Sequence, residues 1–499
     1  MGEPSPDRGA DPPVTLTRAR LPGAGTLVDV HLADGLIGAV TPPGAIPARG
    51  EIVDCDGRFV IPGLWDAHTH MAQWALARRR VDVSGTASPA ELAAVVAAVV
   101  PARRAAGDDL IVGYGYRDAL WADRPSAAVL DAVTGDLAAV MINGDLHSGW
   151  LNSAALTRFG AAGRSDPVLR EAEFFPVIAA ISLAPQDILD RWVGEAVRAA
   201  ASRGVVGVVD FEMGDSVLDW TRRIRAGIDG LRVVCSVWPQ ALTAAIQRGL
   251  PTGSTVPGTQ GLAVVGPLKV ISDGSLNTRT AYCDDPYPGG GSDRHGVLTV
   301  PYPELTRLMR RAWEAGISSA VHAIGDRAVR LAVDAFADVG CAGSVEHAQL
   351  LDSADAVRMA ASGLVASVQP EHAMDDRDIA DTLWAGRTGR TFAFRTLLDA
   401  GVTLALGSDA PVAPLDPWIA ISAAVGRSRD GRAPWHPEQA IGVGPALVAS
   451  TRGRGTIAAG SPADLVAVEQ DPFECRPDEL RTMAVFATML AGRFTYRAA

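Results

Sequence analysis

The amino-acid sequence predicts an α/β protein built on a barrel of eight strand and helix units. A chain of 499 residues has room for one such barrel, which needs roughly 250 residues or more, and for a smaller second domain. Along the middle of the chain, short β-rich runs alternate with alanine-rich helical segments, a pattern typical of βα units that pair into a parallel sheet. At both ends, short apolar runs broken by Gly and Pro indicate small antiparallel strands.

Eight runs are candidates for the barrel strands. They cover residues 59–68, 204–211, 231–237, 266–273, 317–325, 343–350, 364–370 and 402–410. The interval between the first two runs is too long for a single connection and contains strand-like runs of its own, such as LIVGYGY. We therefore expect an insertion after the first barrel strand, positioned over the mouth of the barrel.

These patterns predict the division of the chain into domains. Residues 1–61 and 441–499 are expected to form one small β domain from both termini. Residues 62–440 are expected to form the barrel, with the insertion at 71–200.

Composition limits the class of protein. Hydrophobic residues make up 48% of the chain and the mean hydropathy is +0.14, enough for a buried core and incompatible with a disordered chain. The net charge of -12 gives no electrostatic case for nucleic acid or an anionic membrane as partner, and no signal peptide or long apolar span is present. We expect a cytoplasmic enzyme that acts on a small molecule, with a homodimer left open.

Lysine usage is unusual. Lys269 is the only lysine, and the other 44 basic residues are arginine. A primary amine can lose its proton and react, whereas a guanidinium stays charged. On composition alone, a surface residue without a function is the better explanation.

Candidate metal ligands follow several of the predicted strands. His68 and His70 form an HxH pair at the end of the first strand, where residues i and i+2 point to the same face. His322, His347 and Asp409 end the fifth, sixth and eighth strands. Because the carboxyl ends of barrel strands meet at one face, these five side chains are expected to converge on a metal site.

Lys269 lies near the end of the fourth strand, in GPLKVISDG, and would project into the same basin. A desolvated amine close to metal cations loses its proton readily, and a neutral amine can add carbon dioxide to give a carbamate. A carbamate has two anionic oxygens, one for each of two metal ions, which arginine could not provide. Asp273 and Ser275, which follow, could orient the lysine or cap a following helix.

The motifs PGLWDAHTH, LKVISDGSL, VHAIGDRAV, VEHAQL, SVQPEHA and GSDAPV resemble those of the amidohydrolase superfamily, in the branch that includes N-substituted formamide deformylase and YtcJ-like proteins. The resemblance runs from about residue 28 to the end of the chain. It implies a distorted TIM (β/α)8 barrel with a small β-sandwich built from both termini. It also implies that the metal ligands are His68, His70, carboxylated Lys269, His322, His347 and Asp409.

The expected reaction is hydrolysis of a non-peptide C–N bond, as in an amide or formamide, by a hydroxide activated between two divalent ions, with zinc as the expected metal. Asp409 would take the proton of the attacking water and pass it to the leaving nitrogen. His147 in the insertion and His372 after the seventh strand are candidates to hold the oxyanion, or to be structural.

Three further residues are candidates for substrate binding. Arg279 could anchor a substrate carboxylate, although most arginines of this chain are expected to be solvated. Trp121 and Trp150 belong to an aromatic-rich stretch of the insertion, which would line a pocket for an apolar substrate or pack the insertion's own core.

Two other readings of the site are open. In a mononuclear, deaminase-like site, His68, His70, His322 and Asp409 would hold one metal ion and Lys269 would be structural. Alternatively, the chain would be a metal-binding protein without turnover.

Overall fold

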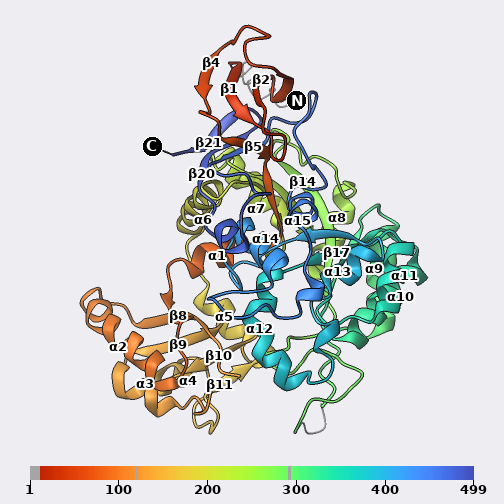
Figure 1. Ribbon diagram of the computed structural model, residues 1–499. Helices are drawn as coiled ribbons and strands as arrows, with labels where there is room; N and C mark the ends of the chain where they lie inside the picture. The colour runs from red at the N-terminus through yellow and green to blue at the C-terminus, as the bar shows by residue number, and fades with distance from the viewer. Residues whose placement is uncertain (1–11, 120, 290–293, 499) are drawn as a thin grey trace.

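The computed structural model describes residues 12–119, 121–289 and 294–498. Its strands pair into three separate sheets. One sheet forms the central barrel, one combines strands from both ends of the chain, and one lies in the insertion between the first two barrel strands. Figure 1 shows the terminal β strands at one end of the molecule and the strands β8–β11 at the other, with the barrel and its helices between them.

The central sheet is the predicted barrel, and each of the eight predicted runs contributes one strand to it. In chain order its strands are β6 (Leu64–Thr69), β12 (Val205–Asp210), β13 (Arg232–Val237), β14 (Ala263–Ile271), β15 (Ser319–Ala323), β16 (Gly343–His347), β17 (Val365–Val368) and β18 (Thr403–Leu406). Each strand pairs in parallel with the next. A parallel bridge between Thr69 and Ala410 joins the last strand to the first, so the barrel is nearly closed.

Helices surround this barrel. They are α1 (Met71–Ala77), α6 (Gln186–Ala201), α7 (Ser216–Arg225), α8 (Leu242–Arg248), α9 (Tyr302–Trp313), α10 (Asp326–Val339), α11 (Ser353–Ala361), α12 (Pro370–Leu383), α13 (Phe394–Asp399), α14 (Pro417–Gly426), α15 (Val443–Ala449) and α16 (Pro477–Arg481). Short 3₁₀ turns are η2 (Pro239–Ala241), η3 (Thr388–Arg390) and η4 (Pro437–Gln439). Helix α10 shows why they form: it buries Val329, Ala332, Val333 and Phe336 at helical spacing and ends at Gly340, whose φ of 68° suits a C-terminal cap.

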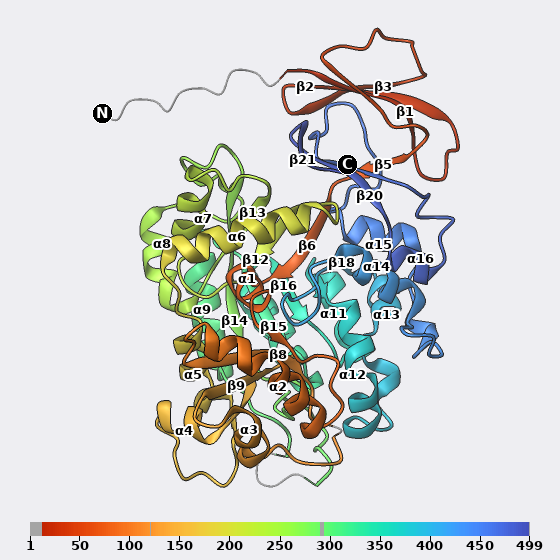
Figure 2. The ribbon, with the colours of Figure 1, turned by 90° about the vertical axis from the view of Figure 1, so that its left-hand side faces the viewer.

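The two ends of the chain share one sheet. Its strands are β1 (Val14–Arg20), β2 (Leu27–Ala33), β3 (Leu36–Thr41), β4 (Glu51–Asp54), β5 (Phe59–Pro62), β19 (Leu465–Val468), β20 (Val485–Leu490) and β21 (Arg493–Arg497). Strand β5 pairs antiparallel with β19, which joins the N-terminal strands to the C-terminal ones. The sheet has its own hydrophobic core, and Figure 2 shows it beyond one end of the barrel.

The first predicted barrel strand, 59–68, is divided between two sheets. Strand β5 belongs to the terminal sheet and β6 to the barrel, with Gly63 between them. A Cβ atom at Gly63 would lie 2.4 Å from a methyl group of Val206, so only glycine lets the chain pass so close to β12. An apolar run without a polar break does not reveal this change of sheet.

The third sheet lies between β6 and β12 in the chain, as predicted for an insertion. Its elements are β7 (Val81–Asp82), α2 (Pro89–Ala105), β8 (Leu110–Tyr116), α3 (Ala127–Thr134), β9 (Ala138–Asn143), β10 (Ser148–Leu151), α4 (Ser153–Arg158), β11 (Val168–Arg170), η1 (Glu171–Glu173) and α5 (Phe175–Ile181). It touches the loops that follow the barrel strands: the Tyr114 hydroxyl donates to the Pro411 carbonyl at 2.7 Å, and Ser275 donates to Asp145 at 2.9 Å. Helix α6, at the end of the predicted insertion, packs into the barrel core instead.

Within the described ranges, no single helix is long and apolar enough to cross a membrane. Two consecutive helical segments, Glu171–Ile181 and Gln186–Ala201, reach the length and apolar composition of a membrane span only when they are taken together. The chain bends by 98° between them.

Candidate active site

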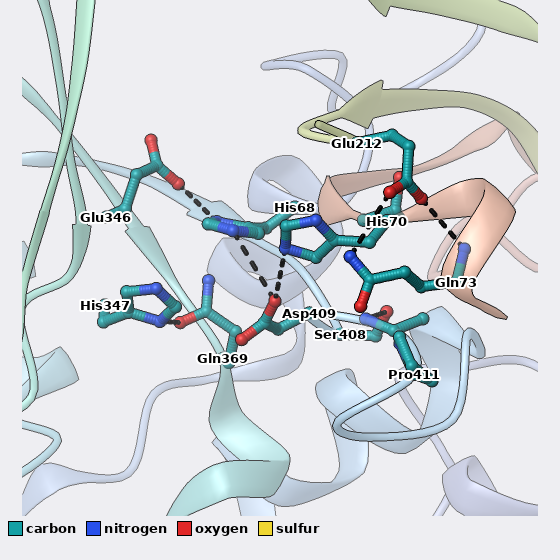
Figure 3. Close-up of polar contacts among 12 residues, drawn as sticks. His68, His70, Gln73, Glu212, Glu346, His347, Gln369, Ser408, Asp409 and Pro411 are labelled. Atoms are coloured by element: carbon teal, nitrogen blue, oxygen red, sulfur yellow. Dashed lines mark hydrogen bonds and ion pairs between the residues drawn. The ribbon is translucent and has the colours of Figure 1, made fainter. Parts of the chain in front are cut away.

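The HxH pair lies at the carboxyl end of β6, and both imidazoles reach Asp409. His68 Nε2 is 3.6 Å and His70 Nε2 is 3.3 Å from Asp409 Oδ1 (Figure 3). The backbone fixes this approach, because Asp409 N donates to the His68 carbonyl at 2.7 Å and His70 N donates to the Ala410 carbonyl at 2.8 Å. The end of the first strand and the end of the last strand thus build one half of the site.

Gly407 makes this closure possible. A Cβ atom there would lie 2.7 Å from the backbone nitrogen of His68, so a side chain at this position would push β18 away from β6. Asp409 itself has a φ of 58°, a conformation that costs energy for a residue with a side chain and that clusters at functional sites.

Lys269 lies inside the barrel on β14, with only 1% of its surface exposed. Its Nζ is 3.2 Å from His68 Nε2 and 4.4 Å from the centre of the Phe211 ring. Burial lowers the pKa of its amine to about 8, although the charges of Glu346 and Asp409 act in the opposite direction. At neutral pH most of the amine is therefore still protonated, but its free base is far more accessible than in an exposed lysine.

The remaining strand-end histidines gather beside His68. The His347 ring lies 4.9 Å from the His68 ring and 4.5 Å from the His322 ring, between centres. His372, at the start of α12, stacks on His347 with 6.3 Å between ring centres. Burial lowers the pKa values of His68, His322 and His347, so these rings are neutral and can offer a lone pair to a metal ion.

Three of these rings are oriented through Nδ1. His68 Nδ1 is 2.7 Å from Glu346 Oε2, His322 Nδ1 is 3.2 Å from Asp273 Oδ1, and His347 Nδ1 is 2.8 Å from Gln369 Oε1. Partners of this kind fix the tautomer and turn the other nitrogen toward a metal ion. The partners Glu346 and Gln369 were not identified from the sequence, because their contacts join separate strands and depend on side-chain directions.

Asp273 has a different role from the two predicted for it. It orients His322 rather than Lys269, and none of the described residues between 274 and 301 is helical, so it caps no following helix. Ser275 donates to Asp145 and thereby joins the barrel to the insertion.

Asp409 is the centre of the cluster. Burial alone would raise its pKa, but the hydrogen bond from His70 and the charge of that ring hold the pKa below its usual range. Two groups of side chains are close enough to hold a metal ion, and both include this carboxylate: one with His68 and His70, the other with His347 and His372. His372 therefore lies where a ligand could be, while His322 and Lys269 flank the two groups.

A pocket of about 260 Å³ opens onto these residues. Its apolar wall includes Phe175 and Ile178 of the insertion, Met213 after β12 and Trp238 after β13. His147 also lines it and carries a carboxylate partner, Glu171, at 2.9 Å. The four apolar side chains were not singled out from the sequence, because they lie on loops and on a short helix without a motif.

The three predicted substrate-binding residues lie elsewhere. Trp150 is fully buried in the core of the insertion, where its indole nitrogen donates to the Ser126 carbonyl at 3.1 Å. Trp121 and Arg279 line a separate cavity of about 790 Å³ between the insertion and the segment after β14. The two cavities share Asn277 in their walls.

Known proteins resemble this chain over most of its length. Residues 51–496 match the amidohydrolase family. N-substituted formamide deformylase from Arthrobacter pascens is 26% identical over 91% of each of the two chains. YtcJ of Bacillus subtilis (strain 168) is 27% identical over 89% of this chain and 90% of its own, and protein LONG AFTER FAR-RED 3 of Arabidopsis thaliana is 27% identical over 89% and 83%.

Solved structures share the fold. An uncharacterized metal-dependent hydrolase from Pyrococcus horikoshii OT3 has a TM-score of 0.76 at 21% identity, over 93% of this chain and 99% of its own. The family match covers the barrel and the second half of the terminal β sheet, and it confirms the resemblance that the strand-end motifs predict. The chain belongs to the amidohydrolase family.

Proposed function

We propose that this hydrolase cleaves the C–N bond of a small amide or formamide at a centre of two divalent metal ions, with zinc as the expected metal. The observation that carries the proposal is the buried Lys269, placed 3.2 Å from His68 inside a cluster of imidazoles that share one buried carboxylate.

The donor atoms fit divalent metal ions. Neutral imidazole nitrogens and a carboxylate are the ligands that zinc prefers. His372 Nε2 is buried without a hydrogen-bond partner, as expected of a nitrogen that faces an ion or a substrate. The residues that would hold the metal ions are His68, His70, Lys269, His322, His347 and Asp409. Metal ions bound there would polarise the substrate carbonyl and lower the pKa of the attacking water.

Lys269 is proposed to act as a carbamate. Its neutral amine adds to carbon dioxide, a C–N bond forms, and one proton is released to solvent. The product carries one negative charge shared by two oxygens, so it would attract neighbouring metal ions that a protonated lysine would repel. The lowered pKa of the amine supports this step because the reacting form is the free base.

Asp409 is proposed to carry the proton. Its carboxylate is ionised in the folded protein and can accept the proton of the attacking water. The same proton then passes to the nitrogen of the leaving amine as the C–N bond breaks. His372 is proposed to donate a hydrogen bond to the carbonyl oxygen as charge develops on it.

The pocket supports a small substrate with an apolar substituent. A cavity of roughly 150 Å³ admits benzene, so about 260 Å³ suits one ring or a short branched chain together with a small acyl group. Phe175, Ile178, Met213 and Trp238 would contact that substituent. The name of the relative N-substituted formamide deformylase agrees with this class of substrate.

The test is a hydrolysis panel on zinc-loaded protein, with N-alkyl and N-aryl formamides, N-acyl amines, lactams and esters. We expect turnover of formamides or short N-acyl amines, with ring substituents preferred over charged ones. Turnover of aminated heterocycles with release of ammonia would favour a deaminase, and no turnover across the panel would favour a metal-binding protein. Native mass spectrometry counts the metal ions: a value near one per chain after loading with zinc and bicarbonate would contradict the two-metal proposal.

A further inference from the structure

His147 and Glu171 lie opposite each other just beyond the ends of two paired strands of the insertion. Strands β10 and β11 are antiparallel, with Ser148 opposite Arg170. One step further along this register places His147 opposite Glu171, and Glu171 N donates to the His147 carbonyl at 2.8 Å. Side chains in such opposite positions are close, and His147 Nδ1 lies 2.9 Å from Glu171 Oε2. The pair is therefore built by the sheet and not by a chance surface contact.

The barrel holds the carboxylate of this pair. Glu171 Oε1 accepts hydrogen bonds from the hydroxyls of Thr280, at 2.9 Å, and Thr278, at 3.3 Å, both in the segment after β14. Glu171 has a φ of 47° and Leu146, beside His147, has a φ of 65°. Conformations of this kind cost energy in residues other than glycine and persist where the surroundings impose them. The structure thus fixes the pair from both the insertion and the barrel.

His147 differs in charge from the histidines of the barrel. Burial lowers its pKa, but the hydrogen bond and charge of Glu171, followed by the charges of Asp145 and Asp409, raise it to about 9. Asp145 and Asp409 thus act on the ring together with Glu171, and the charge of His147 in turn lowers the pKa of His322, which lines the same pocket. The ring of Phe175 covers it at 6.3 Å between centres.

We infer that Glu171 is a positioning residue that holds His147 as an imidazolium, and that His147 Nε2–H binds the substrate's carbonyl oxygen as that oxygen becomes negative. Nδ1 is occupied by Glu171, which leaves Nε2 as the free nitrogen of a ring that lines the pocket. The insertion would then supply a cation beside the neutral rings of His68, His322 and His347. The catalytic part of this inference rests on the proposed amide hydrolysis, whereas the charge on His147 does not.

The experiment compares Glu171→Gln with Glu173→Gln. Glu173 lies on the same turn η1 and is an exposed residue that pairs with Arg164, so it is a matched control. Histidine side chains labelled with ¹³C report each titration by NMR, and His147→Asn assigns the signal. In native protein and in Glu173→Gln we expect His147 to titrate near 9. In Glu171→Gln its pKa should fall clearly below 9, because burial is then opposed only by the more distant charges of Asp145 and Asp409.

The pH dependence of kcat/KM gives the second readout. The imidazolium is present below its pKa and is lost as the pH rises through it, so the alkaline limb in Glu171→Gln should move to lower pH by the same amount as the NMR titration. His147→Asn should lower kcat by about 100-fold to 1000-fold, as for loss of one oxyanion donor. Glu171→Asp, which keeps the charge, should restore part of both effects and serves if Glu171→Gln does not fold.

Two results would overturn the inference. One is a His147 titration that stays unchanged in Glu171→Gln, and the other is a shifted titration with an unmoved alkaline limb. If no substrate in the panel is hydrolysed, the proposed function fails, and the NMR titration still decides whether Glu171 controls the charge of His147.

Discussion

Replacement of Asp273 by Asn should weaken both the fold and the metal site. The side chain is fully buried and accepts hydrogen bonds at both oxygens. Oδ1 faces His322 Nδ1 at 3.2 Å and Ile324 N at 3.0 Å, while Oδ2 faces the backbone nitrogens of Tyr282 and Gly325, both at 2.9 Å. Whichever oxygen becomes an NH₂ group in the variant, two donors lose their acceptor and face another donor.

The size of the effect follows from that count. A hydrogen bond to a charged group contributes about 1.5–3 kcal/mol, so two lost bonds correspond to about 3–6 kcal/mol in the free energy of unfolding. His322 also loses the partner that orients its ring, and loss of such a partner typically lowers metal affinity by about 10-fold to 100-fold. Both effects should appear in one variant because one carboxylate has both tasks.

Two assays measure them. Urea unfolding of metal-free protein gives the stability, and zinc competition against a chelating dye gives the affinity of the folded protein. Asp284→Asn is the control: this residue lies on the same segment, is partly exposed and pairs with Arg330, so its replacement should change the stability by less than about 1 kcal/mol. Native stability together with native zinc affinity in Asp273→Asn would refute the assigned role.

Three further predictions concern the lysine, the insertion and the metal. Lys269→Arg should abolish hydrolysis and lower the zinc count, because a guanidinium forms no carbamate; full activity in this variant would exclude the carbamate. Trp150→Ala should destabilise the protein by about 3–5 kcal/mol as a loss of core packing, while Trp150→Phe should leave KM unchanged; a rise in KM with native stability would instead indicate substrate contact. Removal of zinc with a chelator should lower the melting temperature, and zinc at 100 times its Kd should restore about 2.7 kcal/mol; equal melting with and without zinc would contradict a metal site in the folded state.

The barrel was predictable from the sequence because its strands repeat one simple pattern. Each is a short apolar run followed by a polar residue and a helical segment, and the ends of parallel strands must share one face. The ligand candidates His68, His322, His347 and Asp409 could be located by this rule alone. The structure places all four within one cluster.

Other parts of the site depend on contacts that no local pattern contains. Glu346 directly precedes His347, yet it bonds His68 across the barrel, 278 positions away in the chain. Trp150 and Phe175 belong to the same insertion, and only the packing of that insertion decides that Trp150 enters its core while Phe175 faces the pocket. Composition predicts an aromatic-rich insertion, but it does not determine which ring turns toward the substrate.

The absence of other lysines acquires a physical reason when Lys269 is compared with a buried arginine. Arg427 is as deeply buried and donates to the carbonyls of Trp435, at 3.1 Å, and Phe392, at 3.3 Å. Burial lowers the pKa of Arg427 from 12.5 to about 10 and that of Lys269 from 10.5 to about 8. The two shifts are similar, but the guanidinium remains fully charged at neutral pH, whereas the amine is brought within reach of its neutral form. This chain uses arginine even in its core. It has its lysine at the position where the proposed chemistry needs a cationic side chain that can lose its proton and react as the free amine.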